Sequence, residues 1–200
     1  IAEGDGSEDM KETLAVSMKK RLPWLIALLF LGMFVSSVVG MFEGIVSKVA
    51  ILVCFQSLIL DMAGNVGTQS LAVTIRVLMD EEITFKTRLA LVWKEVKIGM
   101  ANGGLLGIVS FLCIGVYVWL FKGNSILYGF AVSACVGISL VLAMAISSFA
   151  GTVIPLFFHK IKVDPAVASG PLITTVNDLV AVVTYYGMAW LMLFHLFHLA

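Results

Sequence analysis

Long apolar runs separated by short polar stretches dominate this chain of 200 residues. Each run approaches or exceeds the roughly 20 residues that a helix needs to cross the hydrocarbon core of a bilayer. The pattern therefore predicts an all-α, polytopic membrane protein with about five transmembrane helices, over residues 23–42, 45–78, 98–121, 126–148 and 165–194.

The second run is longer than a membrane requires, and two glycines, Gly64 and Gly67, lie near its middle. We expect a break or bend at these glycines, with helix on either side. Between the second and third runs, residues 80–97 place apolar positions at helical spacing with basic residues between them. This arrangement predicts an amphipathic helix that lies on the membrane surface.

Short polar segments define the remaining connections and the beginning of the chain. Residues 122–125 predict a tight turn, residues 159–164 predict a loop, and the fourth helix can extend past Pro155. The chain begins with a small, acidic, polar stretch rather than with methionine, so we expect it to be part of a longer protein. We divide it into an N-terminal linker, residues 1–18, and a transmembrane domain, residues 19–200.

The composition supports a membrane protein and excludes several other classes. Hydrophobic residues make up 60% of the chain, charged residues 13%, and the mean hydropathy is +1.03, whereas about a quarter of a soluble domain is charged. The net charge is zero, so nothing indicates a nucleic-acid partner. The three cysteines lie far apart in apolar runs, which predicts packing residues rather than a disulfide framework or a zinc site.

The basic residues indicate how the helices are oriented. With the N-terminus in the cytoplasm, eleven Lys and Arg residues fall on the cytoplasmic side and two, Lys48 and Lys122, fall outside. This asymmetry follows the positive-inside rule and predicts an external C-terminus. The eleven residues are Lys11, Lys19, Lys20, Arg21, Arg76, Lys86, Arg88, Lys94, Lys97, Lys160 and Lys162.

Most predicted spans lack an ionisable residue, but the fifth contains Asp178 near its middle. A carboxylate at that depth costs at least about 2.5–3.5 kcal/mol, so it requires a cavity, a partner or an ion. Gly170 and Thr174 share its helical face, as does Thr175, and Pro171 frees a backbone carbonyl. Oxygen ligands of this kind suit hard cations, with Mg²⁺ held largely through its water shell. The alternative is an aspartate that joins helices structurally.

Other polar groups in or near the spans are weaker candidates. Asn65 and Gln69 lie four residues apart, beside Gly64, and are expected either to line the same path as Asp178 or to join helices. Glu43 lies at the end of the first span. It is expected to be an acid at the membrane interface or, alternatively, to attract ions at the mouth of the path. We expect His195 and His198 to be interfacial residues, and the alternative is that the two bind one metal ion.

Two stretches of the chain resemble the signatures of the MgtE family of magnesium channels. They are Ala63-Gly-Asn-Val-Gly-Thr-Gln-Ser70, with Arg76 following, and Asp164-Pro-Ala-Val-Ala-Ser-Gly-Pro-Leu-Ile-Thr-Thr-Val-Asn-Asp178. The first span, with Arg21-Leu-Pro-Trp-Leu25 and Phe42-Glu43, is similar to that of the family as well.

The resemblance implies a multi-pass protein of the cell's inner (plasma) membrane, in contact with lipid, that forms a homodimer with its pore at the dimer interface. It implies a hydrated Mg²⁺, with Mn²⁺ or Ca²⁺ as other hard cations, held by Asp178 of both subunits. Asn65 and backbone carbonyls near Gly170 and Thr174 would assist. Family members usually also carry a cytosolic N-domain and a pair of regulatory CBS domains, so we expect this chain to be the membrane domain and the full-length protein to carry those domains as well.

Three other readings compete with a magnesium pathway. A proton- or cation-coupled secondary transporter also uses a mid-membrane acid, although the sequence contains no internal repeat. An intramembrane hydrolase is disfavoured, because Ser169 lies 26 residues from His195 in the same span and no HExxH motif is present. A plain membrane anchor would not need Asp178 or the polar stretch 64–70.

Overall fold

The structure, a computed structural model, describes residues 13–80 and 84–196, with the backbone alone at residues 80, 165–169, 171 and 194. Lys11, His198 and most of the predicted linker lie outside the described residues. The described part contains helices and no strand, and five of the helices are long and apolar enough to cross a membrane. This confirms the predicted all-α, polytopic fold. The helices are α1 (Leu14–Gly40), α2 (Glu43–Lys48), α3 (Ile51–Asp80), α4 (Phe85–Lys122), α5 (Ile126–Lys160) and α6 (Pro165–Ala189), followed by a π-helical turn, η1 (Trp190–Leu196).

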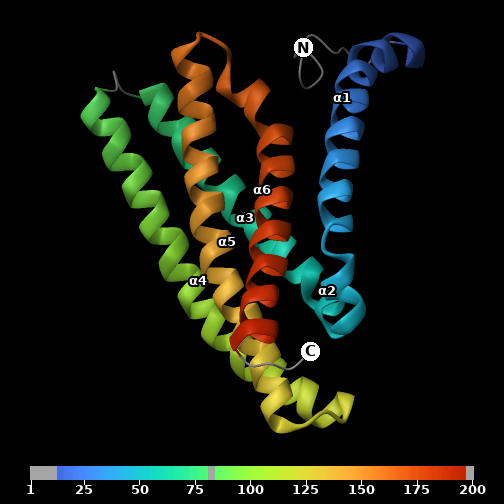
Figure 1. Cartoon of the computed structure of the whole chain (residues 1–200). Helices are drawn as coiled ribbons and strands as arrows, with labels where there is room; N and C mark the ends of the chain where they lie inside the picture. Colours follow the sequence, from blue (N-terminus) through green and yellow to red (C-terminus); the bar gives the residue numbers. More distant parts are fainter. Residues whose placement is uncertain (1–12, 81–83, 197–200) are drawn as a thin grey trace.

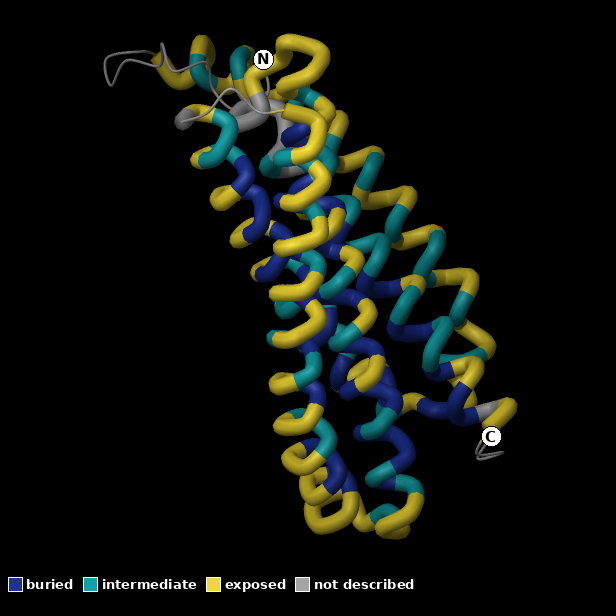
Figure 2. Tube along the Cα trace, turned by 90° about the vertical axis from the view of Figure 1, so that its left-hand side faces the viewer, coloured by how far each residue is buried: buried dark blue, intermediate teal, exposed yellow. Residues whose placement is uncertain are grey.

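Helix α5 is the centre of the bundle and contacts α3, α4 and α6 (Figure 1). Buried residues follow the inner sides of these helices, whereas the outer sides are exposed (Figure 2). Helix α1 stands apart on the far side of α6, and none of the residues of α1 is buried. It contacts α6 mainly through the C-terminal end of α1. Most of the apolar surface of α1 therefore faces away from the protomer.

The second span differs from the sequence prediction at two places. It begins at Ile51 rather than Ile45, because Val49 leaves helical geometry (φ −129°, ψ 68°) while its side chain enters the core. The expected break at Gly64 and Gly67 is wrong, since α3 is one uninterrupted helix. Two glycines weaken a helix by about 1 kcal/mol each, but unpaired backbone groups in a bilayer cost several kcal/mol each.

The predicted surface helix is also wrong as a separate element. Residues 85–122 form one helix of 38 residues, about 57 Å long at 1.5 Å per residue, which exceeds the roughly 30 Å bilayer core. The basic residues in the first turns of α4 therefore belong to the part of this long helix that projects beyond the membrane. Glu95, which lies in this stretch, is only 4% exposed.

The connections agree with the turn chemistry of the sequence. Gly123 adopts the left-handed conformation (φ 66°) that ends α4, and the Ser125 hydroxyl accepts the Tyr128 N–H at 3.2 Å to begin α5. Helix α5 continues past Pro155 to Lys160, as the sequence allowed. Helix α1 begins at Leu14, so residues 14–18 of the predicted linker are helical.

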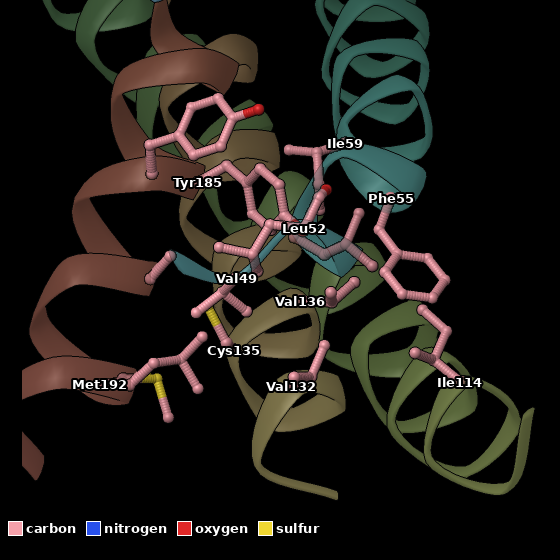
Figure 3. Packing of buried hydrophobic residues seen from close by; sticks show 14 of the residues in the cluster. Val49, Leu52, Phe55, Ile59, Ile114, Val132, Cys135, Val136, Tyr185 and Met192 are labelled. Atoms are coloured by element: carbon pink, nitrogen blue, oxygen red, sulfur yellow. The ribbon is translucent and has the colours of Figure 1, made fainter. Parts of the chain in front are cut away.

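An apolar core joins the N-terminal halves of α3 and α5 to the C-terminal half of α6 (Figure 3). The Tyr185 hydroxyl donates to the Leu52 carbonyl at 2.9 Å, and the Tyr186 hydroxyl donates to Gln56 Oε1 at 2.6 Å. Phe42, between α1 and α2, stacks on Tyr186 with ring centroids 5.5 Å apart. Helix α6 is therefore fastened to α3 and to the end of α1 by aromatic residues.

Small residues hold α4 against α5, a feature that the sequence analysis did not identify. Gly99, Gly103 and Gly107 recur every four residues, so they lie on one face of α4. A Cβ atom on Gly103 would lie 2.8 Å from the Val141 Cα, and one on Gly107 would lie 2.8 Å from the Gly137 carbonyl oxygen. The helix backbones therefore approach too closely for larger side chains, as in other membrane helix pairs.

We expect Gly103→Val to destabilise the folded protein by about 1–3 kcal/mol, because the valine must push α4 away from α5. Gly104→Val is the matched control, since a Cβ atom on Gly104 meets no atom within 4 Å. Thermal unfolding in detergent, followed by loss of the monodisperse elution peak, measures the difference. Equal unfolding temperatures for the two variants would contradict this account of the α4–α5 contact.

Candidate cation site

Asp178 lies well inside the membrane-spanning part of α6. Thirteen helical residues precede it (165–177), and eighteen follow it as far as Leu196. Its side chain is half-buried, and it lies seven residues, about two turns, before Tyr185. Because the Tyr185 hydroxyl reaches the backbone of α3, Asp178 also lies on the side of α6 that faces α3.

The residues one and two turns before Asp178 supply further oxygen atoms. The Thr174 hydroxyl is exposed and donates to the Gly170 carbonyl at 3.3 Å. A carbonyl oxygen has two lone pairs, so Gly170 keeps one for a water molecule or an ion. Thr175 is half-buried. The predicted face of α6 therefore carries a carboxylate, a hydroxyl and a backbone acceptor within about 12 Å.

Asn65 and Gln69 meet in one cavity of about 260 Å³ between α3, α4 and α5. Asn102 of α4 adds a third amide to its lining, whereas Asp178 does not line it. The structure thus brings the two α3 amides together in this cavity. Apolar groups complete the lining, from Met62, Val66, Leu105, Leu106 and Met144.

Gly64 contributes backbone rather than a side chain to the polar part of α3. The Thr68 hydroxyl donates to the Gly64 carbonyl at 3.1 Å and to the Asn65 carbonyl at 2.9 Å. A Cβ atom on Gly64 would meet no atom within 4 Å. This position therefore leaves open space beside the polar stretch of α3.

The remaining candidates lie near the ends of helices. Glu43 begins the short helix α2 and is exposed, as expected for a residue at the membrane boundary. His195 is exposed and packs edge-on against Trp190, with ring centroids 4.4 Å apart. Within the part of the chain that the structure describes, no three His, Cys, Asp or Glu side chains gather as a ready metal site.

Sequence reasoning missed three polar residues inside the spans. Asp61 lies one turn before Asn65 on α3 and is exposed, and Asn102 lines the amide cavity. Asn177, next to Asp178, is completely buried. The four-residue spacing between Asp61 and Asn65 was the signal for the first, whereas Asn102 sits in a glycine-rich apolar run that gives no such signal.

Asn177 marks the point where three helices cross. Its side chain packs against Gly67 of α3, and the Gly67 carbonyl oxygen in turn faces Gly151 of α5. Neither polar atom of the Asn177 amide has a hydrogen-bond partner among the described residues. Asn177 adjoins Asp178, and Gly67 is two residues from Asn65. This crossing therefore fixes how far along the helix bundle Asp178 lies relative to Asn65.

Five membrane-crossing helices with a carboxylate and several amides inside the spans define a multi-pass membrane protein with an intramembrane polar site. The family model described as "MgtE: Divalent cation transporter" matches residues 56–188, which is more than half of the chain. The chain therefore belongs to the MgtE family, and the recognition made from the two signature stretches is confirmed.

Three relatives named "Magnesium transporter MgtE" extend this comparison. The protein of Bacillus subtilis is 42% identical over 174 residues, which cover 87% of this chain and 37% of the relative. That of Enterococcus faecalis is 40% identical over 184 residues, covering 91% and 38%. That of Thermus thermophilus is 32% identical over 174 residues, covering 86% and 36%. The chain thus spans somewhat over a third of the length of these relatives.

Proposed function

We propose that this chain forms a pathway for Mg²⁺ across the membrane, with a hydrated ion held by Asp178. The observation that carries the proposal is the position of this carboxylate, inside α6 and on its α3-facing side. The names of the relatives support magnesium as the ion. A carboxylate at this depth is tolerated when it faces water or a cation, and transport supplies both.

The ligand atoms favour a hard cation that keeps most of its water. Carboxylate, amide and carbonyl oxygens are the ligands of Mg²⁺, Mn²⁺ and Ca²⁺. A single carboxylate on each protomer does not replace the octahedral water shell of Mg²⁺, which dehydrates reluctantly. Asp178 would therefore contact the ion through water, with the Gly170 carbonyl and the Thr174 hydroxyl binding the same water shell. Asn65 would contribute an amide from α3.

A homodimer completes this site with a second carboxylate. The described residues of one protomer gather no three metal ligands of the His, Cys, Asp or Glu type. A two-fold axis beside α3 and α6 would place two Asp178 side chains around one ion, because a two-fold interface uses the same surface of both copies. The apolar surface of α1, which the protomer itself does not bury, is available to lipid or to the second copy.

The cytoplasmic N-terminus and external C-terminus remain part of the proposal, because they rest on the positive-inside asymmetry. In this orientation the start of α3 and the end of α6 lie outside. For the relatives, whose length is more than twice that of the matched part, we propose cytosolic regulatory domains that close the pathway.

The proposal is tested by reconstituting the chain into vesicles loaded with a Mg²⁺-sensitive dye and adding external Mg²⁺. The proposal predicts saturable uptake by a protein that is dimeric by light scattering in detergent. A monomer that transports would contradict the dimer interface, and folded protein without any divalent uptake would contradict the pathway. Competition by external Mn²⁺ and Ca²⁺ in the same assay ranks the ions.

Asn65→Ala is expected to raise the half-saturating Mg²⁺ concentration by about two- to fivefold and to leave maximal uptake largely intact. The amide contributes a water-mediated hydrogen bond, worth about 0.5–1.5 kcal/mol, but no charge. Concentration-dependent uptake measures this effect, and Val53→Ala on an exposed apolar position of α3 is the control. Complete loss of uptake in folded Asn65→Ala would show that the amide has a larger role than the proposal gives it.

A further inference from the structure

A continuous polar stripe runs along one side of α3, and two of its residues also line the cavity between α3, α4 and α5. Ser57, Asp61, Asn65 and Gln69 follow one another at four-residue intervals, and all four are exposed. From Ser57 to Gln69 the stripe rises twelve residues, about 18 Å of helix, inside the span Ile51–Met79. It therefore occupies more than half of the roughly 30 Å bilayer core.

The charged member of this stripe, Asp61, lies near the middle of the membrane. Ten helical residues (51–60) precede it, which corresponds to about 15 Å from the start of α3. It has no hydrogen bond or ion pair with another described residue. The nearest basic residue on the same face of α3, Arg76, is fifteen residues away, about 22 Å along the helix.

The inner side of α3 is occupied by other residues, so Asp61 does not turn into the protomer. Ala63, Val66, Gly67 and Ser70 are buried, whereas Asp61 points away from them. A carboxylate facing lipid at this depth would cost at least about 2.5–3.5 kcal/mol. An aqueous path along the stripe removes most of this cost, since the carboxylate stays hydrated.

Contacts between α3 and α6 fix the level of Asp61 relative to Asp178. Gly67 packs against Asn177, and Gln56 accepts a hydrogen bond from Tyr186, so the two helices run antiparallel. Asp178 therefore lies at about the level of residue 66 of α3. Asp61 is five residues nearer to the start of α3, roughly 8 Å towards the proposed outside.

We propose that Asp61 forms a second cation site, external to Asp178 on the same pathway. This inference rests on the proposed function and adds to it a site that a hydrated divalent cation meets before Asp178. The Asp61 carboxylate binds the ion through its water shell, and Asn65, one turn further in, holds the same waters as the ion moves inward. In the dimer, the Asp61 site and the Asp178 site each contain two carboxylates, one from each copy.

The test measures Mg²⁺ uptake against external and internal Mg²⁺ concentration for Asp61→Asn, Asp61→Glu and Asp178→Asn, in the full chain reconstituted with known sidedness. Asp61→Asn is expected to raise the half-saturating external concentration at least about tenfold, a change equivalent to about 1.4 kcal/mol. Asp61→Glu keeps the charge and is expected to stay within about threefold of the parent. Val53→Ala, at an exposed apolar position two turns before Asp61 on the same helix, is the control and is expected to leave the curve unchanged.

The outcomes separate this inference from the proposed function. If Asp61→Asn follows the parent curve while Asp178→Asn loses uptake, the outer site is wrong and the magnesium pathway stands. If Asp61→Asn shifts only the internal concentration dependence, the outer position is wrong. If both variants follow the parent curve, the proposed function itself fails. If Asp61→Asn does not yield folded dimers, Asp61→Ser is measured in the same assay with the same expected shift. Serine is suitable because Ser57 already places a hydroxyl on this stripe.

Discussion

Replacing Asp178 by alanine is expected to abolish Mg²⁺ binding at the site and, with it, uptake through the protein. Two unit charges 4 Å apart attract by about 4 kcal/mol at an effective dielectric constant of 20, and a divalent ion experiences more. We therefore expect affinity to fall by more than about a hundredfold, equivalent to about 2.8 kcal/mol. Isothermal titration with Mg²⁺ and vesicle uptake measure the two quantities.

Asp178→Asn separates the charge from the shape of the side chain. The amide keeps the volume and one oxygen, so the fold is retained while most of the affinity is lost. Because Asp178 is only half-buried, both variants are expected to elute as the parent does. Mg²⁺ binding by Asp178→Asn at parental strength would mean that another group holds the ion.

The second large effect is expected at the crossing of α3, α5 and α6, where Gly67→Ala should destabilise the protein by about 1–3 kcal/mol. A Cβ atom on Gly67 overlaps the Asn177 side chain, which has no free space because it is completely buried. The overlap would push α6 away from α3 and change the level of Asp178 relative to Asn65. Thermal unfolding in detergent and Mg²⁺ uptake measure the two consequences.

A second substitution identifies the contact that is responsible. Asn177→Ala removes the overlapping amide, so the double variant Gly67→Ala, Asn177→Ala is expected to unfold at a higher temperature than Gly67→Ala alone. Gly64→Ala, three residues away on the same helix, is the stability control, because a Cβ atom there meets no atom within 4 Å. Additive losses in the double variant would be inconsistent with a direct contact between these residues.

The sequence predicted the number of spans because hydropathy over about 20 residues reflects the physics of the bilayer directly. It failed where tertiary contacts decide the local structure. The glycines of α3 are kept helical by backbone pairing, and the junction at Val49 is set by burial of one side chain in the core. The amphipathic pattern of residues 85–97 did not reveal that the helix continues to Lys122, because periodicity is the same in a surface helix and in a projecting one.

The candidate site was partly accessible from the sequence. Asp178 and Asn65 stand out as polar residues in apolar surroundings, and helical spacing placed Gly170, Thr174 and Asp178 on one face. Which helix each face meets is a property of packing, so the cavity shared by Asn65, Gln69 and Asn102 appears only in the structure. The role of Gly67 as the partner of Asn177 likewise depends on how closely α3 and α6 approach.

A coupled transporter would use the same carboxylate in a different way. Asp178 would then bind a proton or a coupling ion, and Mg²⁺ movement would respond to the proton gradient. A pathway for hydrated Mg²⁺ responds only to the electrochemical gradient of Mg²⁺. Collapsing the proton gradient with a protonophore is therefore expected to leave the initial uptake rate unchanged once the membrane potential is held constant.

The most direct test of the central claim compares uptake of Mg²⁺ into vesicles that contain the parent chain or Asp178→Ala, with no proton gradient. The two proteins are reconstituted at equal, measured densities, and empty vesicles give the leak. A magnesium pathway through Asp178 predicts uptake driven by the Mg²⁺ gradient in parent vesicles and only the leak with Asp178→Ala. Equal uptake by the two proteins, or uptake by the parent only after a proton gradient is imposed, would contradict it.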